Sequence, residues 1–227
     1  MYRPFLRLVC LFALITSAPA LAGSREVSIQ AADGLALKGT WHEPEKPGER
    51  AVLLMHAMFS NRGAWAPLLP ELLGAGFRVL TVDLRGYGET GGVLDVPAAL
   101  ADARGWLAWM RQQGGVARDR VGVLGASLGG NVGIQLCAAD PQCGAVVALS
   151  PSGNFSEAML DFSGRGLMVF AAANDGNSAR AVRAMASSAQ GDFALRLVEG
   201  SAHGIPALFD GERNRLGEVR DWLDQHL

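Results

Sequence analysis

The chain has 227 residues, and 20 Lys and Arg against 22 Asp and Glu give it a formal net charge of −2 at pH 7. A balance this close to neutrality gives no reason to expect nucleic acid or an anionic membrane surface as a partner. The length is enough for one α/β domain with a substantial hydrophobic core.

The first 22 residues have the three parts of a secretory signal peptide. Arg3 and Arg7 make a basic start, residues 8–15 are apolar, and Ala20-Leu21-Ala22 is a typical cleavage site. The apolar stretch is short and interrupted for a membrane span. We therefore expect residues 23–227 to form a single domain that is periplasmic or secreted, with no stable membrane insertion after cleavage.

Cysteine usage agrees with export. One of the 3 cysteines lies in the signal segment, and the other two, Cys137 and Cys143, are six residues apart. They fall near the end of one predicted helix and at the start of the next predicted strand. An oxidising compartment favours a disulfide across this short connection, and two buried free thiols are the alternative.

The predicted elements alternate between strands and helices. Residues 25–30 and 35–42 alternate apolar and polar positions around Ala32-Asp33-Gly34, which predicts an N-terminal hairpin. Further strands are predicted at 51–55, 77–82, 121–124, 144–149, 167–172 and 193–198. Helices are predicted at 65–73, 95–113, 131–139, 178–188 and 207–227. The alternation predicts an α/β fold, with a doubly wound, mostly parallel sheet of about eight strands and helices on both faces.

The most informative motif is Gly125-Ala126-Ser127-Leu128-Gly129, which lies between an apolar strand and a helix. This is the G-x-S-x-G pattern of a nucleophile elbow. A serine on such a strained turn stands above the sheet, and the flanking glycines let strand and helix approach closely. The alternative is a glycine-rich turn whose serine only caps the helix.

A serine hydroxyl needs a base to become a nucleophile at neutral pH. His203 lies in a loop after the last predicted strand, where ligands gather in parallel sheets. The other histidines are less suitable: His42 lies in the hairpin, His56 ends a strand before the elbow, and His226 is next to the C-terminus. His203 is therefore the predicted base, and activity should rise as its imidazole loses a proton near neutral pH.

The base in turn needs an acid to orient it. Asp175 follows the predicted strand 167–172 and lies between Ser127 and His203 in chain order. It could instead be a turn residue or the N-cap of the next helix. The remaining candidates are at the wrong end of a strand or beyond the base; they are Asp161, Asp192 and Asp210.

The developing oxyanion needs two backbone N–H groups. Leu128, directly after the nucleophile, gives one. The loop 56–61 should give the other, with Met58 as the first choice and Phe59 as the alternative.

A second glycine pattern, Gly86-Tyr87-Gly88-Glu89-Thr90-Gly91, fits the G-x-G-x-x-G of dinucleotide sites. No helix is predicted to begin at that turn, so the dinucleotide interpretation is disfavoured. The sequence also has no P-loop, no helical H-E-x-x-H and no paired C-x-x-C. It therefore suggests no cofactor and no metal.

These motifs together resemble the α/β-hydrolases over essentially the whole chain after the signal segment. The resemblance rests on the elbow, on the run Asp83-Leu84-Arg85-Gly86-Tyr87-Gly88, on His56 at a strand end, and on the order Ser, Asp, His. It implies an enzyme that cleaves small-molecule carboxylic esters or related acyl compounds through an acyl-enzyme. A peptidase or acyltransferase on the same scaffold, and a non-catalytic binding protein, are the alternatives.

Only 17 residues separate the strands 144–149 and 167–172, where many α/β-hydrolases insert a helical cap. The chain is in this respect similar to compact, lidless members such as dienelactone hydrolases, although those use cysteine where Ser127 stands. An apolar rim for substrate is expected from Phe59, Trp65 and Phe155. The alternative is that these aromatic side chains simply fill the core.

Overall fold

The computed structural model describes residues 23–209 and 215–227. The predicted signal peptide lies outside these residues. Within the two described ranges, no helix has the length and apolarity needed to cross a membrane.

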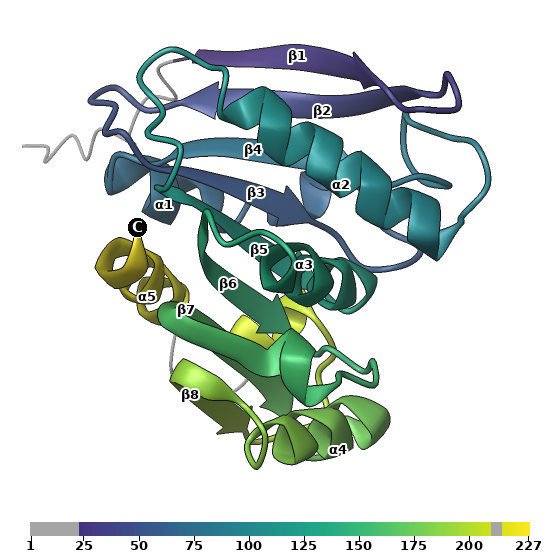
Figure 1. Ribbon diagram of the computed structural model, residues 1–227, viewed down its shortest axis with the longest axis vertical. Coiled ribbons are helices and arrows are strands. Elements are labelled where there is room, and N and C mark those ends of the chain that lie inside the picture. The colour runs from purple at the N-terminus through teal and green to yellow at the C-terminus, as the bar shows by residue number, and fades with distance from the viewer. Residues whose placement is uncertain (1–22, 210–214) are drawn as a thin grey trace, which may run out of the picture.

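Eight strands make up the sheet of the described chain: β1 (Gly23–Gln30), β2 (Ala36–Glu43), β3 (Ala51–Met55), β4 (Arg78–Asp83), β5 (Val121–Ala126), β6 (Cys143–Leu149), β7 (Asp161–Ala172) and β8 (Gln190–Val198). Their order across the sheet is β1-β2-β4-β3-β5-β6-β7-β8. The hairpin β1–β2 and the pair β2–β4 are antiparallel, and the other pairs are parallel (Figure 1). The predicted fold class is confirmed.

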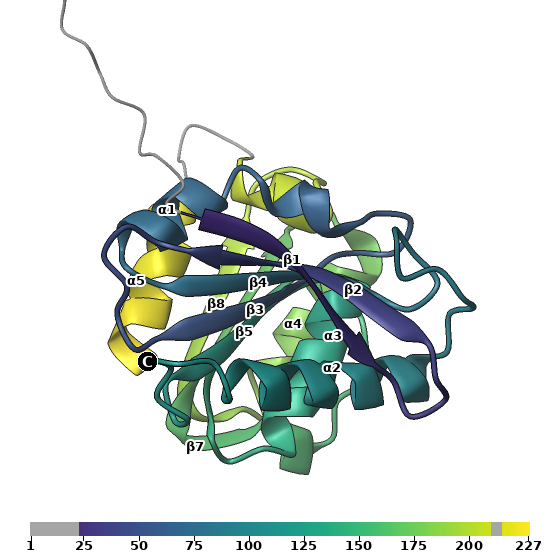
Figure 2. The same ribbon diagram turned by 90° about the horizontal axis from the view of Figure 1, so that it is seen from above.

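Helices cover both faces of this sheet. They are α1 (Leu69–Gly74), α2 (Val96–Met110), α3 (Leu128–Ala138), α4 (Gly176–Met185) and α5 (Leu216–His226). Buried side chains of α2, α3 and α4 pack in one core cluster, and those of α1 and α5 pack in a second. Figure 2 shows the two groups of helices on opposite sides of the sheet.

The strands β3 and β5 are continuous apolar runs in the sequence, as expected for strands whose two faces are both covered. Every residue of β3, β4 and β5 is buried. In parallel strands the carboxyl ends meet at one edge, so the loops after β3, β5, β6, β7 and β8 gather there. This edge holds the residues that the sequence selects for chemistry.

The structure divides the expected helix 65–73 into two short pieces. A 3₁₀ turn, η1 (Arg62–Trp65), precedes α1, and Pro70 lies in the first turn of α1. Pro70 has no N–H to continue an earlier helix, so a new helix has to begin there. The expected helix 207–227 is likewise described as η3 (Ile205–Leu208) and α5, with residues between them outside the described range.

Two other boundaries differ from the prediction. Helix α3 begins at Leu128, directly after Ser127, rather than at residue 131. Strand β7 begins at Asp161 and pairs there with Gln190, before the register shifts between Phe162 and Gly166. The polar and glycine-rich residues 163–166 carry no alternating apolar signal, which is why the sequence pattern shows only the second half of the strand.

Cys137 at the end of α3 and Cys143 at the start of β6 are paired, with their Cα atoms 5.2 Å apart. Both side chains are fully buried. The connection between them lies at the end of α3 that is farther from Ser127.

Candidate active site

Ser127 lies on a strained turn between β5 and α3. Its backbone has φ 50° and ψ −110°, a region that non-glycine residues rarely adopt. A Cβ atom on Gly125 would lie 2.1 Å from the carbonyl oxygen of Gly129, and one on Gly129 would lie 2.1 Å from that of Met55. Only glycine fits at these two positions, so the spacing of the motif has a direct steric cause.

Asp175 and His203 come together from two neighbouring strand ends. Asp175 follows β7, and His203 lies in the loop between β8 and η3. His203 Nδ1 lies 2.8 Å from Asp175 Oδ2. In the neutral tautomer that this contact favours, Nδ1–H donates to the carboxylate and Nε2 is left to accept a proton.

The carboxylate of Asp175 is turned away from its own helix. Asp175 occupies the N-cap position of α4, yet its side chain accepts no hydrogen bond from the helix amides. The side chain of Asp175 is mostly buried, whereas that of His203 is 44% exposed. A buried acid beneath a more accessible imidazole is the arrangement expected for an orienting group and a base.

The His203 loop lies against the residue that precedes the nucleophile. A Cβ atom added to Gly204 would lie 3.6 Å from Cβ of Ala126. In the described part of the chain, no hydrogen bond joins the Ser127 hydroxyl to His203. In substrate-free enzymes such contacts are often long and tighten only when substrate binds.

His56 lies at a strand end, but both of its ring nitrogens are hydrogen-bonded to the backbone. It has no exposed surface, its Nε2 accepts from the N–H of Leu84 at 3.0 Å, and its Nδ1–H donates to the carbonyl of Ala57 at 2.6 Å. Burial lowers the pKa of this imidazole. Both ring nitrogens are occupied, so His56 is unsuited to act as a base.

The loop after β3 brings the two candidate oxyanion residues beside α3. A Cβ atom on Gly129 would lie 2.8 Å from the carbonyl oxygen of His56, where this loop begins. Met58 and Phe59 follow, with exposed side chains, and Leu128 is the first residue of α3. The amide of Leu128 thus lies at a helix N-terminus, where partial positive charge favours an anion.

The carboxylate of Asp83, the last residue of β4, holds the segment that follows this strand in place. It accepts hydrogen bonds from the backbone N–H groups of Arg62 at 2.7 Å and Glu89 at 2.8 Å, and it also pairs with the Arg62 guanidinium. A Cβ atom on Gly88 would lie 2.2 Å from this carboxyl group. Asp83 therefore ties together the loops after β3 and β4.

The three aromatic residues expected to line the substrate site differ in exposure. Phe59 is 91% exposed, and its ring lies edge-on to Tyr87. Phe155 is half-buried and packs on the core cluster beside α3. Trp65 has no exposed surface and packs in the opposite core cluster, so in this conformation it serves the core and presents nothing to a substrate.

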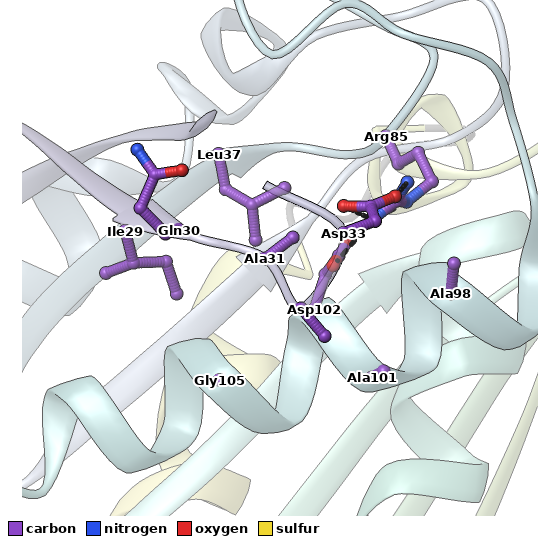
Figure 3. A pocket seen from close by; sticks show the side chains of 11 residues that line it. Ile29, Gln30, Ala31, Asp33, Leu37, Arg85, Ala98, Ala101, Asp102 and Gly105 are labelled. Atoms are coloured by element: carbon purple, nitrogen blue, oxygen red, sulfur yellow. Dashed lines mark hydrogen bonds and ion pairs between the residues drawn. The ribbon is translucent and has the colours of Figure 1, made fainter. Parts of the chain in front are cut away.

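A cavity of about 220 Å³ lies between the β1–β2 turn and α2 (Figure 3). On its polar side Arg85 pairs with Asp33 and with the buried Asp102. The hydrogen bond from Arg85 is the main reason why the pKa of Asp33 is lowered. Neither the candidate nucleophile nor the acid–base pair lines this cavity, and both of its carboxylates are already paired with Arg85.

Metal ligands do not gather at either place. Among residues 23–209 and 215–227, no three His, Cys, Asp or Glu side chains are grouped so that they could hold a metal ion.

The sequence analysis does not identify two serines that lie next to the acid–base pair. Ser150, directly after β6, accepts a hydrogen bond from the N–H of Gly204 at 2.8 Å. Ser178 in α4 has its Oγ 3.5 Å from His203 Nδ1. The one signal available was the position of Ser150 at the carboxyl end of a buried strand, and Ser178 carried no signal in the sequence.

Comparison with known proteins identifies the family. The profile of the α/β-hydrolase fold family matches residues 50–208. An uncharacterized protein of Mycobacterium tuberculosis is 34% identical over 139 residues, which are 60% of this chain and 49% of that protein. The pimeloyl-[acyl-carrier protein] methyl ester esterase of Edwardsiella ictaluri is 38% identical over 96 residues, or 42% of this chain and 33% of the esterase. The chain thus spans about half or less of these relatives.

Among solved structures, the dienelactone hydrolase of Anabaena variabilis has a similar fold. The TM-score is 0.74 at 19% sequence identity, and the alignment covers 92% of this chain and 100% of that one. The chain belongs to the α/β-hydrolase fold family.

Proposed function

We propose that the protein is an exported serine hydrolase that cleaves small-molecule carboxylic esters or related acyl compounds. The observation that carries the proposal is the 2.8 Å contact between Asp175 and His203, beside an elbow that holds Ser127 in a strained conformation. Strain of this kind persists only where the surrounding structure imposes it, and it is concentrated at functional sites.

The chemistry follows from these positions. His203 Nε2 takes the proton of the Ser127 hydroxyl as its oxygen attacks the carbonyl carbon, and the resulting imidazolium is stabilised by Asp175. The tetrahedral oxyanion is held by the N–H of Leu128 and by a second N–H from Met58 or Phe59. His203 then gives its proton to the leaving alkoxide. Water attacks the acyl-enzyme by the same route and restores Ser127.

Two observations favour a small ester over a long polymer or lipid. The chain between β6 and β7 holds only the short 3₁₀ turn η2 (Glu157–Leu160), so no helical cap encloses the site among the described residues. One relative at 38% identity is named as a methyl ester esterase. The exposed ring of Phe59, within the loop proposed to supply the second oxyanion N–H, offers an apolar surface for the acyl or leaving group.

Export is part of the proposal. It is supported by the signal-like first 22 residues and by the pairing of Cys137 with Cys143, which suits an oxidising compartment. The peptidase, acyltransferase and binding-protein alternatives are supported by no specific contact in the described residues.

The test is hydrolysis of p-nitrophenyl esters of increasing acyl length by the wild-type protein and by Ser127→Ala. We expect turnover of short acyl chains that is abolished in Ser127→Ala, with wild-type folding by circular dichroism. Full activity in the alanine variant would refute the serine mechanism. A strong preference for long chains with interfacial activation would contradict the open site.

A further inference from the structure

Only three non-glycine residues in the described chain have a positive φ: Phe59, Ser127 and Ser150. They follow the carboxyl ends of β3, β5 and β6, three neighbouring strands at the edge where the candidate site lies. Such a conformation is strained for a residue with a Cβ atom. Ser127 is the proposed nucleophile, whereas Ser150, with φ 50°, is strained without taking part in the proposed chemistry.

Ser150 has no exposed surface, and its N–H, its Oγ and its carbonyl oxygen each take part in a hydrogen bond. Its N–H donates to the carbonyl of Phe170 in β7 at 2.7 Å. Its Oγ accepts from the N–H of Gly204, the residue after His203, at 2.8 Å. The strained turn thus connects β6 to β7 and to the loop that carries the base.

The carbonyl of Ser150 makes the connection to the acid. It accepts a hydrogen bond from the Ser178 hydroxyl at 3.2 Å, and Ser178 lies in the first turn of α4, three residues after Asp175. The same hydroxyl oxygen lies 3.5 Å from His203 Nδ1. Because the Ser178 proton is directed to Ser150, a lone pair of its oxygen faces Nδ1–H beside the Asp175 carboxylate.

We propose that Ser150 is a positioning residue, which fixes the His203 loop against the sheet and keeps the imidazole aligned with Asp175 and Ser127. Ser178 is the second contact of the same arrangement. This inference rests on the proposed serine mechanism. Without the Ser150 hydroxyl, the N–H of Gly204 is left unpaired, and the loop is free to shift the imidazole.

The matched variants Ser150→Ala and Ser150→Gly separate positioning from folding. Both remove the hydroxyl, but glycine relieves the strain at φ 50°, so Ser150→Gly should melt at a higher temperature than Ser150→Ala. If Ser150 positions the base, kcat falls in both variants, by roughly 10- to 100-fold, because small misplacements cost rates of this size. KM should change little, because Ser150 has no surface that a substrate could touch.

Activity is expressed per active site, titrated to completion with a fluorophosphonate, so that unfolded protein does not count. Ser187→Ala is the control, because it removes a serine hydroxyl that bonds a backbone carbonyl at the far end of α4. We expect its kcat to equal that of the wild type. In proton NMR spectra, the far-downfield signal of His203 Nδ1–H should persist in Ser187→Ala and broaden or vanish in Ser150→Ala.

The inference would be overturned if Ser150→Gly had the wild-type kcat per titrated site. It would also be overturned if the loss of kcat in the two variants only paralleled their loss of melting temperature. If Ser150→Ala fails to fold, Ser150→Gly decides alone. A wild-type protein that does not react with the fluorophosphonate is a different result, because it refutes the serine mechanism itself.

Discussion

At the scale of single residues, Asp175 shows how position and side-chain direction differ. It stands at the N-cap of α4, where an aspartate normally bonds the amides of its own helix, but its carboxylate contacts His203 instead. The charge of Asp175 therefore serves the imidazole more than the helix.

This contact leads to a direct prediction for Asp175→Asn. The amide can hold the ring in the wrong tautomer and cannot stabilise an imidazolium, so kcat should fall by roughly 10³- to 10⁴-fold. The melting temperature should change little, because no helix cap is lost. Asp161→Asn is the control, since the carboxylate of Asp161 accepts hydrogen bonds from the N–H and the hydroxyl of Ser163, away from His203. Near-wild-type turnover in Asp175→Asn would mean that another carboxylate orients the base.

The sequence identified residues that carry a spacing signal and missed those that do not. The elbow glycines exclude any side chain, so the position of Ser127 could be read from the motif. Ser150 and Ser178 act through geometry that no spacing rule describes, and a serine after a strand is common. Trp65 lies in the core and not at the rim of a substrate site. The sequence does not distinguish the two, because an apolar residue in a core and one at a pocket rim look alike there.

At the scale of elements, the strands were predicted better than the helix boundaries. Continuous burial gives β3, β4 and β5 a clear apolar signal, whereas Pro70 divides a stretch whose leucines have helical spacing. The start of α3 could not be predicted from helix propensity, because the glycines after Ser127 are poor helix formers. They stand there because the helix packs closely against neighbouring backbone.

The N-terminal hairpin β1–β2 contains a buried histidine, His42, whose protonation bears on stability. His42 in β2 is buried, and its ring nitrogens contact Ser24 Oγ of β1 at 2.8 Å and Thr81 Oγ1 of β4 at 3.2 Å. Burial lowers the pKa of His42 below its usual value. The unfolded chain therefore binds a proton more readily than the folded protein, so His42 favours the folded state at neutral pH and loses this effect as pH falls.

We expect the free energy of unfolding in urea to be lower at pH 5 than at pH 7.5. The decline should begin near pH 6.5, the ordinary value for histidine, and continue toward the lowered pKa. His56 contributes in the same direction, because burial lowers its pKa too. In His42→Gln the difference between the two pH values should shrink. An unchanged difference would show that His42 has no share in it.

The Cys137–Cys143 pair joins two elements, α3 and β6. Closing so short a loop stabilises by about 2 kcal/mol at most. Reduction of exported protein should therefore lower the melting temperature by roughly 2–8 °C and leave kcat unchanged, because the pair lies away from Ser127. The intact mass of unreduced protein checks the premise: two free thiols there would mean that the pair is not oxidised or that the chain is not exported.

At the scale of the whole molecule, parallel topology assembles the candidate site from distant parts of the chain. Ser127, Asp175 and His203 follow the carboxyl ends of β5, β7 and β8 at one edge of the sheet, and Ser150 follows the end of β6, which lies between β5 and β7. The fold class and this chain order could be predicted, because each strand signal is local. Acyl preference could not, because it depends on how the loops after β3 and β6 shape the rim around Phe59.

Activation of Ser127 is the central claim, and mass spectrometry after fluorophosphonate labelling tests it most directly. We predict one covalent adduct per wild-type chain, mapped to Ser127, much slower labelling in Asp175→Asn, and none in Ser127→Ala. An adduct on another residue, or equal labelling of Ser127→Ala, would contradict the account.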